Sequence, residues 1–405
     1  TVASITFGIN NNNDITLTVN GVTLTVTGDI IQNHGAGSTS NSTTYQTTLA
    51  GTGTIYCTGN FQIGNTTGPT TKAVNTTLVS SQITQLTING NMAFNAVGNN
   101  TSTATNYPTL NLDKGKITLN GQFTSSSLNG PNKQADIYAY GRFNSGTTSN
   151  AVTLELTNTQ AISSTFTANF VVDFLYSAGH DGTVIYNSSS ATQTVYTTSN
   201  ASVGTNPQVY YNLLLQGTST KVADGSTLSV GNDWTSIGGT VNLTTNDPDV
   251  TVGGNWVNST TVNDGDGDMT ISGNATNSGT INASNGITTI NGDLTSSGNI
   301  VQGLGNMNVH GDLLNSGNLT EGAGSLTMWG DYTNTGNFTA STGNTVFAGM
   351  SEVLKDSGSG TMFNNVIFNG NGGSTKPAVM NRGNFSVSSS GILTMVTNTY
   401  LTTNG

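Results

Sequence analysis

The residues of this chain that most strongly suggest chemistry stand at alternate positions in one short stretch. Asp264, Asp266 and Asp268 are separated by glycines in the run Asn-Asp-Gly-Asp-Gly-Asp. Carboxylates spaced in this way can surround a hard cation with oxygen ligands, which Ca²⁺ prefers. The run departs from an EF-hand loop because Met269 replaces the expected glycine and Ala275 replaces the bidentate glutamate. We therefore weigh a stabilising calcium site against a solvated acidic turn.

Residues that suit catalysis are sparse. Polysaccharide lyases and hydrolases need two or three converging carboxylates, often with a nearby cation. The two arginines, Arg142 and Arg382, lie far apart in the sequence, and the Gly-His-Asp run that contains His180 has no acid pair nearby. His34 and His310 are isolated. We expect no enzyme, no catalytic residue and no cofactor other than the Ca²⁺ considered above, with a polysaccharide lyase or hydrolase on a β-helix as an alternative.

These residues belong to a chain with a strict internal repeat. A glycine recurs every 19 residues, at Gly254, Gly273, Gly292, Gly311, Gly330 and Gly349. Within each repeat the third, ninth, sixteenth and eighteenth places are mostly apolar, as in Leu313, Leu319, Leu326 and Met328, and they lie in short stretches of alternating polarity. Alternation is the period of a strand, and glycine and asparagine suit the corners between strands. The pattern predicts a right-handed parallel β-helix with about 19 residues per regular coil and three strands in each coil.

Two kinds of polar residue repeat with the same period. Asparagines recur at positions 258, 277, 315 and 334, and we expect their side-chain amides to bond from coil to coil in a structural ladder. Aspartates recur at positions 293, 312 and 331. Like charges one coil apart repel, so we expect these carboxylates to point into solvent unless bound cations offset the repulsion.

The first half of the chain repeats with a longer period. Gly28, Gly59, Gly90 and Gly121 are each 31 residues apart, which indicates coils enlarged by loop insertions such as 34–48 and 64–76. A longer duplication relates the residues after Gly182 to those after Gly343. The sequence thus predicts three regions: a first strand and joint over 1–13, an irregular solenoid with long loops over 14–181, and a regular solenoid with a duplicated module over 182–405.

Bulk composition excludes several partners. The formal net charge is −11 and the nine Lys and Arg residues form no cluster, so we expect no nucleic-acid partner. No apolar run is long enough to span a membrane, and Cys57, the one cysteine, allows no internal disulfide. The low lysine content and the solenoid pattern favour an extracellular or cell-surface location. The chain starts at Thr1 without methionine or leader, as expected of a processed chain or a fragment.

The repeats resemble those of a known family. Coils such as Gly-Asp-Tyr-Thr-Asn-Thr-Gly-Asn-Phe-Thr, from Gly330, and punctuating runs such as Gly-Thr-Val-Ile-Tyr-Asn, from Gly182, and Phe-Asn-Asn-Val-Ile-Phe, from Phe363, resemble the repetitive β-solenoid surface proteins of the Bacteroidetes type. The resemblance is close over 182–405 and looser over 1–181. It implies secreted proteins that act as adhesins or form fibres.

The ends of the chain suggest how such a rod would assemble. Ala3, Ile5, Phe7 and Ile9 alternate with small or polar residues, and asparagines follow over 10–13. This strand could cap its own first coil or pair with a neighbouring subunit. We therefore hypothesise that the chain is its own partner in a fibre assembled head to tail through the solenoid ends. The alternative is a surface adhesin that binds glycans through the long loops of residues 30–180. The Asn-x-Ser/Thr sites are about as frequent as chance predicts, so glycosylation is not indicated.

Overall fold

A computed structural model shows that the chain is an all-parallel β-solenoid. It describes residues 1–9, 15–34, 44–63, 75–80, 83–94, 109–112, 115–125, 134–139, 152–162, 169–173, 182–197, 209–349, 353–358, 363–369, 378–381, 392–395 and 400–403. These ranges contain strands, turns and bends but no helix. The chain forms two compact units, Thr1–Ser219 and Thr220–Gly405, which we call unit 1 and unit 2. The predicted all-β, parallel β-helix class is therefore confirmed.

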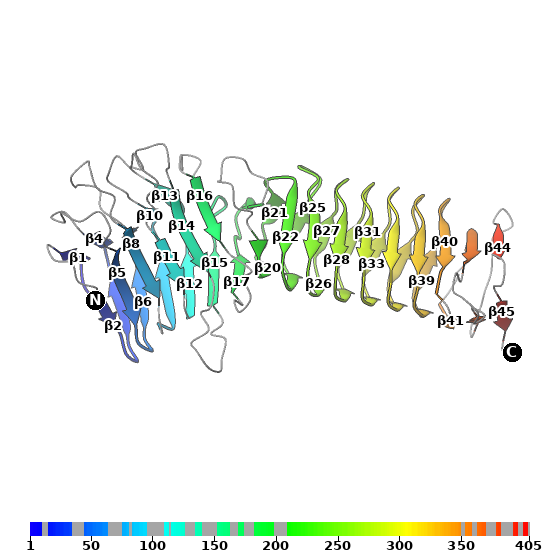
Figure 1. Cartoon of the computed structure of the whole chain (residues 1–405), viewed down its shortest axis with the longest axis horizontal. Coiled ribbons are helices and arrows are strands. Elements are labelled where there is room, and N and C mark those ends of the chain that lie inside the picture. The colour runs from blue at the N-terminus through cyan, green and yellow to red at the C-terminus, as the bar shows by residue number, and fades with distance from the viewer. Residues whose placement is uncertain are drawn as a thin grey trace. The chain divides into compact units, whose positions relative to one another are not determined.

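In unit 1 the chain passes through three parallel sheets in turn, and from β1 to β15 every third strand belongs to the same sheet (Figure 1). The strands β16 and β17 then continue the second and third sheets. The first sheet contains β1 (Ile5–Ile9), β4 (Ile30–His34), β7 (Phe61–Ile63), β10 (Met92–Phe94) and β13 (Phe123–Ser125). The second contains β2 (Ile15–Thr18), β5 (Thr44–Ala50), β8 (Asn75–Ser80), β11 (Thr109–Leu112), β14 (Gln134–Ala139) and β16 (Asn169–Asp173). The third contains β3 (Thr23–Val26), β6 (Thr54–Cys57), β9 (Gln85–Ile88), β12 (Gly115–Leu119), β15 (Val152–Leu156), β17 (Thr183–Tyr186) and β20 (Asn212–Leu215). The remaining strands of unit 1 are β18 (Thr192–Val195) and β19 (Val209–Tyr210).

The 31-residue glycine spacing is the period of the first coils of unit 1, from β3 to β12. Strand β6 pairs with β9 so that Ile55 lies beside Leu86, and β9 pairs with β12 in the same manner. The glycines stack as well, because the Gly90 amide donates to the Gly59 carbonyl at 3.0 Å. Inward side chains such as Ile55 and Leu86 are at most 1% exposed. The insertions foreseen over 34–48 and 64–76 fall mainly outside the described residues.

Unit 2 is a regular stack of three-stranded coils (Figure 1). Its first sheet contains β23 (Trp234–Ser236), β26 (Trp256–Asn258), β29 (Ala275–Asn277), β32 (Leu294–Ser296), β35 (Leu313–Asn315), β38 (Tyr332–Asn334), β41 (Val353–Asp356), β43 (Ala378–Asn381) and β45 (Tyr400–Thr403). Its second contains β21 (Thr220–Ala223), β24 (Thr240–Asn242), β27 (Thr261–Asn263), β30 (Thr280–Asn282), β33 (Asn299–Val301), β36 (Asn318–Thr320) and β39 (Asn337–Thr339). Its third contains β22 (Thr227–Val230), β25 (Asp249–Val252), β28 (Met269–Ile271), β31 (Thr288–Ile290), β34 (Met307–Val309), β37 (Leu326–Met328), β40 (Asn344–Phe347), β42 (Asn365–Phe368) and β44 (Leu393–Met395).

Each coil of unit 2 buries the residues that the repeat predicts. Leu313, Leu319, Leu326 and Met328 point inward and are at most 1% exposed, whereas Leu314, between two inward residues of β35, is 41% exposed. Burial of such a side chain contributes about 1.5–3 kcal/mol, so these apolar columns are the main source of stability.

Glycine marks each coil because the backbones come very close at that corner. A Cβ atom at Gly330 would lie 2.4 Å from the carbonyl oxygen of Gly311, which no side chain tolerates without a shift of the backbone. The Gly311 amide in turn donates to the Gly292 carbonyl at 3.0 Å. The close approach of successive coils therefore explains the 19-residue register.

The asparagine ladder lies inside the solenoid. The side-chain Nδ2 of Asn258 donates to Oδ1 of Asn277 at 2.8 Å, and Asn315 donates to Asn334 in the same way at 2.8 Å. Ser296 occupies the intervening coil and accepts from Asn277 at 3.2 Å. All five side chains are at most 1% exposed, so the ladder satisfies amides that would be costly to bury alone. The structural role predicted for these asparagines is confirmed.

The aspartate ladder lies on the outside and bonds to the backbone. Oδ1 of Asp293 accepts the amide of Asp312 at 2.9 Å, and Oδ1 of Asp312 accepts the amide of Asp331 at 2.8 Å. Asn255 and Asn274 do the same in the preceding coils. Each side chain thus supplies an acceptor to the next coil at the corner that follows the glycine. Asp293 and Asp312 are exposed, as the sequence predicts, and Asp331 is partly buried.

The two units divide the chain differently from the three predicted regions. The division falls between Ser219 and Thr220. The expected boundaries after residues 13 and 181 fall on positions outside the described residues and stay predictions. Within unit 1, the two apolar strands of the first duplicated run, β17 and β20, are parallel partners. Their counterparts in unit 2, β40 and β42, pair in the same way.

Candidate functional site

The three carboxylates of the acidic run do not converge. The run connects β27 to β28 at a corner of the coil. The Asp264 side chain points into the solenoid and is 4% exposed, whereas Asp266 and Asp268 are exposed. Within the described ranges, no three side chains of His, Cys, Asp or Glu are arranged to hold a metal ion. The calcium site stays a prediction, and the structure places its three proposed ligands on two sides of the wall.

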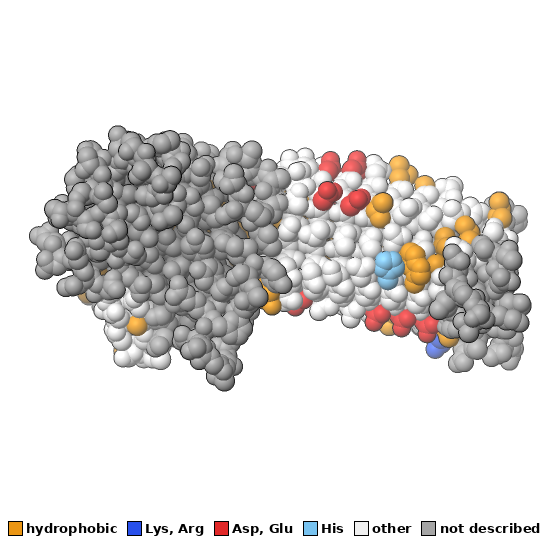
Figure 2. Space-filling model, in the orientation of Figure 1, with side chains coloured by type: hydrophobic (Ala, Val, Ile, Leu, Met, Phe, Trp, Pro, Cys, Tyr) orange, Lys and Arg blue, Asp and Glu red, His pale blue; other side chains and the backbone are white. Residues whose placement is uncertain are grey.

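The exposed carboxylates of this corner hold the neighbouring coils together. Asp247 and Asp249, one coil earlier, accept the amides of Asp266 and Asp268, each at 3.0 Å. Asp268 then accepts the amide of Ile287 at 2.8 Å. Hydrogen bonds from Ser284 and Asn285 lower the pKa of Asp266, which keeps that carboxylate ionised. Figure 2 shows the acidic side chains of unit 2 gathered in small groups on its surface.

Asp264 has the opposite electrostatic environment. Burial, which penalises the charged form, raises its pKa from 3.8 to about 7, although its carboxylate accepts the amide of Gly265 at 3.1 Å. The charges of Asp247 and Asp268 act in the same direction as burial. Glu321, at the same corner three coils further on, is also buried, and burial raises its pKa. The interior of this corner therefore favours neutral carboxylic acids.

The predicted assembly strand lies on the first coil of unit 1. Strand β1 pairs in parallel with β4, with Ile5 beside Ile30 and Ile9 beside His34. The Phe7 side chain is 7% exposed, Ile5 is partly buried and Ala3 is exposed. The first strand thus completes the sheet of its own chain, which is one of the two arrangements that the sequence allows. In this position β1 is the terminal strand of its sheet.

Apolar columns of the core reach solvent at the outermost strands. Val2 forms a parallel bridge with Val26, yet Val2 is 39% exposed and Val26 is 0% exposed. Leu393 in β44 is the partner of Val366 in β42, and it is 45% exposed where Val366 is 0% exposed. Val2 and Leu393 each extend a column of buried apolar side chains, but one side of each residue is exposed to solvent. Such an open side is a surface on which another coil could stack.

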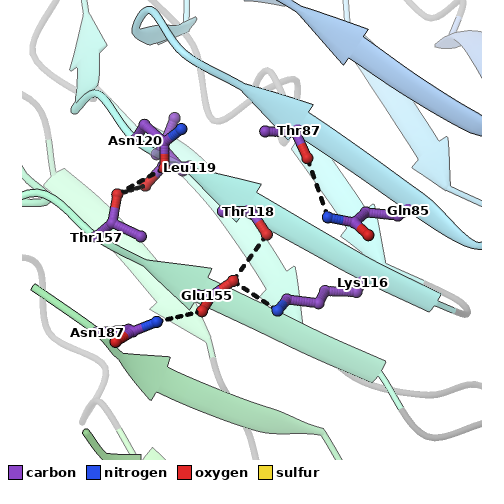
Figure 3. Close-up of polar contacts among 9 residues, drawn as sticks. All are labelled: Gln85, Thr87, Lys116, Thr118, Leu119, Asn120, Glu155, Thr157 and Asn187. Carbon is purple, nitrogen blue, oxygen red and sulfur yellow. Dashed lines mark hydrogen bonds and ion pairs between the residues drawn. The ribbon is translucent and has the colours of Figure 1, made fainter. Parts of the chain in front are cut away.

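Unit 1 contains a polar cluster that the sequence does not reveal. Glu155, in β15 of the third sheet, accepts bonds from Thr118 at 2.9 Å and from Asn187 at 2.7 Å, and it forms an ion pair with Lys116 at 2.6 Å (Figure 3). The Glu155 side chain is 9% exposed and that of Lys116 is 37% exposed. These three donors come from the coils on either side of β15. Glu155 therefore joins three successive coils.

Glu155 is better suited to holding neighbouring coils together than to transferring a proton. Burial alone would raise the pKa of Glu155, but the hydrogen bonds from Lys116, Asn187 and Thr118 together lower it below the ordinary value. A carboxylate whose lone pairs are occupied and whose pKa is lowered is a weak general base. Beside it, Asn120 donates to Asn89 at 2.7 Å and accepts from Thr157 at 2.7 Å. Side chains on this sheet thus form a network of hydrogen bonds between successive coils.

The other residues singled out for catalysis form no metal-ligating cluster within the described ranges. The Nδ1 atom of His310 lies 2.8 Å from Oδ1 of Asn291. His34 ends β4. Arg142, Arg382 and the run 179–181 fall outside the described residues. The Cys57 thiol is buried, and burial raises its pKa, which is typical of a structural cysteine.

Comparisons with other proteins add no functional assignment. None of the family models, curated proteins or solved structures compared with the chain matches it. Among the described residues, no helix has the length and apolar character that crossing a membrane requires.

Proposed function

We propose that the chain is a non-enzymatic structural protein, the subunit of an extracellular surface fibre that assembles head to tail through the ends of its solenoid. The observation that carries this proposal is the open side of the apolar core at Leu393. That residue is 45% exposed although its register partner, Val366, is 0% exposed. A first coil stacked on this end would bury the apolar side chain and extend the parallel ladder.

The N-terminal end offers a matching surface. There Val2 is 39% exposed beside the fully buried Val26, and β1 and β2 are each the outermost strand of their sheets. Parallel strands on the two ends can pair in the same way as successive coils within a unit. The partner is then a second copy of this chain.

The extracellular location rests on composition and on the sequence resemblance. Nine Lys and Arg residues in 405 and a net charge of −11 suit a secreted surface protein better than one that binds nucleic acid. The coils and punctuating runs resemble those of the repetitive β-solenoid surface proteins of the Bacteroidetes type.

The experiment changes the open end while leaving the wall of the solenoid intact. Leu393→Lys places a charge on the exposed core column, and Leu304→Lys places the same charge on a side chain that is 68% exposed elsewhere in unit 2. We expect the wild-type chain and the Leu304 variant to form filaments in negative-stain electron microscopy. The Leu393 variant should remain monomeric, because stacking would bury an unpaired charge.

Circular dichroism verifies that both variants keep the β-structure of the wild type. Wild-type protein that remains monomeric at high concentration would contradict the proposal. Filaments that form equally well from the Leu393 variant would show that assembly uses another surface.

A further inference from the structure

One column on the surface of unit 2 departs from its repeat. The position that follows each strand of the third sheet holds Ser272, Asn291, His310, Trp329 and Ala348 in successive coils. The backbone keeps these positions in register, since the Trp329 amide donates to the Val309 carbonyl at 3.0 Å and the Ala348 amide donates to Met328 at 2.7 Å. The fold accepts small residues there. Two adjacent aromatic rings are therefore not required by the coil.

The two rings form an ordered pair. The centroids of the His310 and Trp329 rings lie 4.4 Å apart, and their planes meet at 69° in an edge-on contact. The Nδ1 atom of His310 lies 2.8 Å from Oδ1 of Asn291, which fixes the imidazole against the preceding coil. The imidazole then supports the indole on one side. Figure 2 shows a histidine, in pale blue, beside a hydrophobic side chain on the surface of unit 2.

The indole of Trp329 remains open to solvent. It is 39% exposed, and the next residue in its column, Ala348, is too small to cover it. The other two tryptophans of the chain behave differently. Trp234 and Trp256 are at most 1% exposed and stack in the core with centroids 5.3 Å apart. An exposed indole that a neighbouring ring holds in place offers a flat aromatic face to a ligand.

The outward column beside the indole is polar and uncharged, whereas the aspartate ladder begins two residues further along each coil, at Asp312 and Asp331. The adjacent outward column of the third sheet carries Thr289, Asn308 and Thr327 in register. Nδ2 of Asn308 donates to Oγ1 of Thr289 at 3.5 Å, and Asn291 is exposed beside them. No carboxylate, ammonium or guanidinium occupies these positions. Amide and hydroxyl groups in rows, next to an aromatic ring, suit a ligand with many hydroxyl groups and no net charge.

We propose that Trp329 and His310, with Asn291, Asn308 and Thr327, form a binding site for a neutral polysaccharide chain. A sugar ring has one face of C–H bonds, which carry partial positive charge and pack on the electron-rich face of an indole. Its equatorial hydroxyls point sideways, where they can exchange bonds with the amide and hydroxyl columns. These columns continue in register from coil to coil, so several sugar rings of an extended chain can lie across successive coils.

The observations favour a neutral glycan over other partners. An acidic polysaccharide or a nucleic acid would meet a chain of net charge −11 with no basic group at the site. A protein partner would require a larger apolar area than one indole and one imidazole provide. The proposed site lies on the wall of unit 2, so it does not depend on assembly through the solenoid ends.

The experiment uses the indole itself as the probe. With Trp234 and Trp256 buried, Trp329 is the tryptophan that acrylamide quenches most readily. We expect cellohexaose or chitohexaose to protect it from quenching, and cellulose or chitin to retain the protein in a sedimentation assay. Trp329→Ala should weaken retention about tenfold or more. Trp329→Phe should keep part of the affinity, because a smaller aromatic face remains.

Leu304→Ala is the matched control, because it removes a side chain that is 68% exposed but has no aromatic ring. It should leave retention unchanged, and polygalacturonate should neither retain the protein nor protect the indole. Three results would overturn the proposal. They are failure of both neutral oligosaccharides to protect the wild-type indole, equal retention of the Trp329→Ala variant, and loss of self-association in that variant with retention intact. The last result would assign the indole to a protein contact.

Discussion

A single bend of the chain determines which carboxyl groups of the acidic run are buried and which are exposed. Asp264 and Asp266 are two residues apart, and in a continuous strand they would share a face. The chain bends between them, so that Asp264 lies inside the coil and is 4% exposed, while Asp266 lies outside. One carboxyl group is thereby favoured in its neutral form and the other as an ion. The pKa of Asp264 is raised and the pKa of Asp266 is lowered, so the two shifts report which carboxyl group lies inside the solenoid and which lies outside.

The stability of the fold should depend on the protonation of Asp264. Its pKa rises from 3.8 to about 7 on folding, so the folded state binds the proton more tightly than the unfolded state does. Stability from this group is complete below the unfolded pKa and declines as pH rises to about 7. Above that pH, Asp264→Asn should be more stable than the wild type by on the order of a few kcal/mol. Near pH 4 the two proteins should be similar, as measured by thermal unfolding.

The neighbouring Asp266→Asn variant is the control, because the pKa of Asp266 is lowered and its substitution should not stabilise the protein at high pH. The same measurement tests the calcium site. Calcium that stabilised the wild type but not the Asp264→Asn variant would show that Asp264 is a ligand, and would contradict the assignment of this residue to the interior. A stability difference that did not change with pH would contradict the raised pKa.

At the scale of the element, side-chain ladders join coil to coil. In the outer column each Asp or Asn accepts the backbone amide of the residue one coil further on, as Asp293 does for Asp312 at 2.9 Å. An aspartate contributes the acceptor together with a charge that repels the next aspartate. An asparagine contributes the acceptor alone, and Asn274 performs this role for Asp293. The acceptor is therefore what the corner requires.

Substitutions at Asp293 should separate these two contributions. Asp293→Ala leaves the Asp312 amide without its acceptor and should lower the free energy of unfolding by about 1 kcal/mol. Asp293→Asn keeps the acceptor and removes a repulsion, so it should be neutral or slightly stabilising, most clearly at low salt. Urea unfolding of both variants at low and high salt measures the difference. Equal losses for both variants would show that the charge matters more than the bond.

Elements with a constant period could be predicted from the sequence, and elements that cross an insertion could not. The asparagine ladder is visible because Asn258 and Asn277 are 19 residues apart, as are Asn315 and Asn334. The Glu155 cluster is hidden because its partner Thr118 is 37 residues away and its partner Asn187 is 32 residues away. Loops of different length separate these coils, so no spacing in the sequence links the residues. The sequence does not show that Asp264 turns inward, because alternation of polar and apolar residues does not reveal where the chain bends at a corner.

At the scale of the whole molecule, a coil contacts only the coils on either side of it. Removal of residues 292–310, one full period, should therefore preserve unit 2. Asn277 would then face Asn315, and Ala275 would face Leu313, so the buried columns stay polar or apolar as before. Removal of 292–301 instead places apolar residues on polar columns and should disrupt the stack. Far-UV circular dichroism and amide hydrogen exchange measure the outcome.

The full-period deletion should retain the β signal per residue and the amide protection of the remaining coils. The partial deletion removes fewer residues but should lose protection over several coils. Equal disruption by both deletions would show that the coils of unit 2 depend on distant parts of the chain, as in a globular domain.

The direction of the coil-to-coil hydrogen bonds has a mechanical consequence. In unit 2 these bonds, such as that from the Gly311 amide to the Gly292 carbonyl, run along the stack. A force that pulls one end of unit 2 away from the other puts the same tension on every coil-to-coil interface, and the weakest interface yields first. Each coil that peels off releases 19 residues, or about 65 Å of extended chain. Unit 2 should therefore lengthen under tension in many small steps and dissipate the applied work coil by coil.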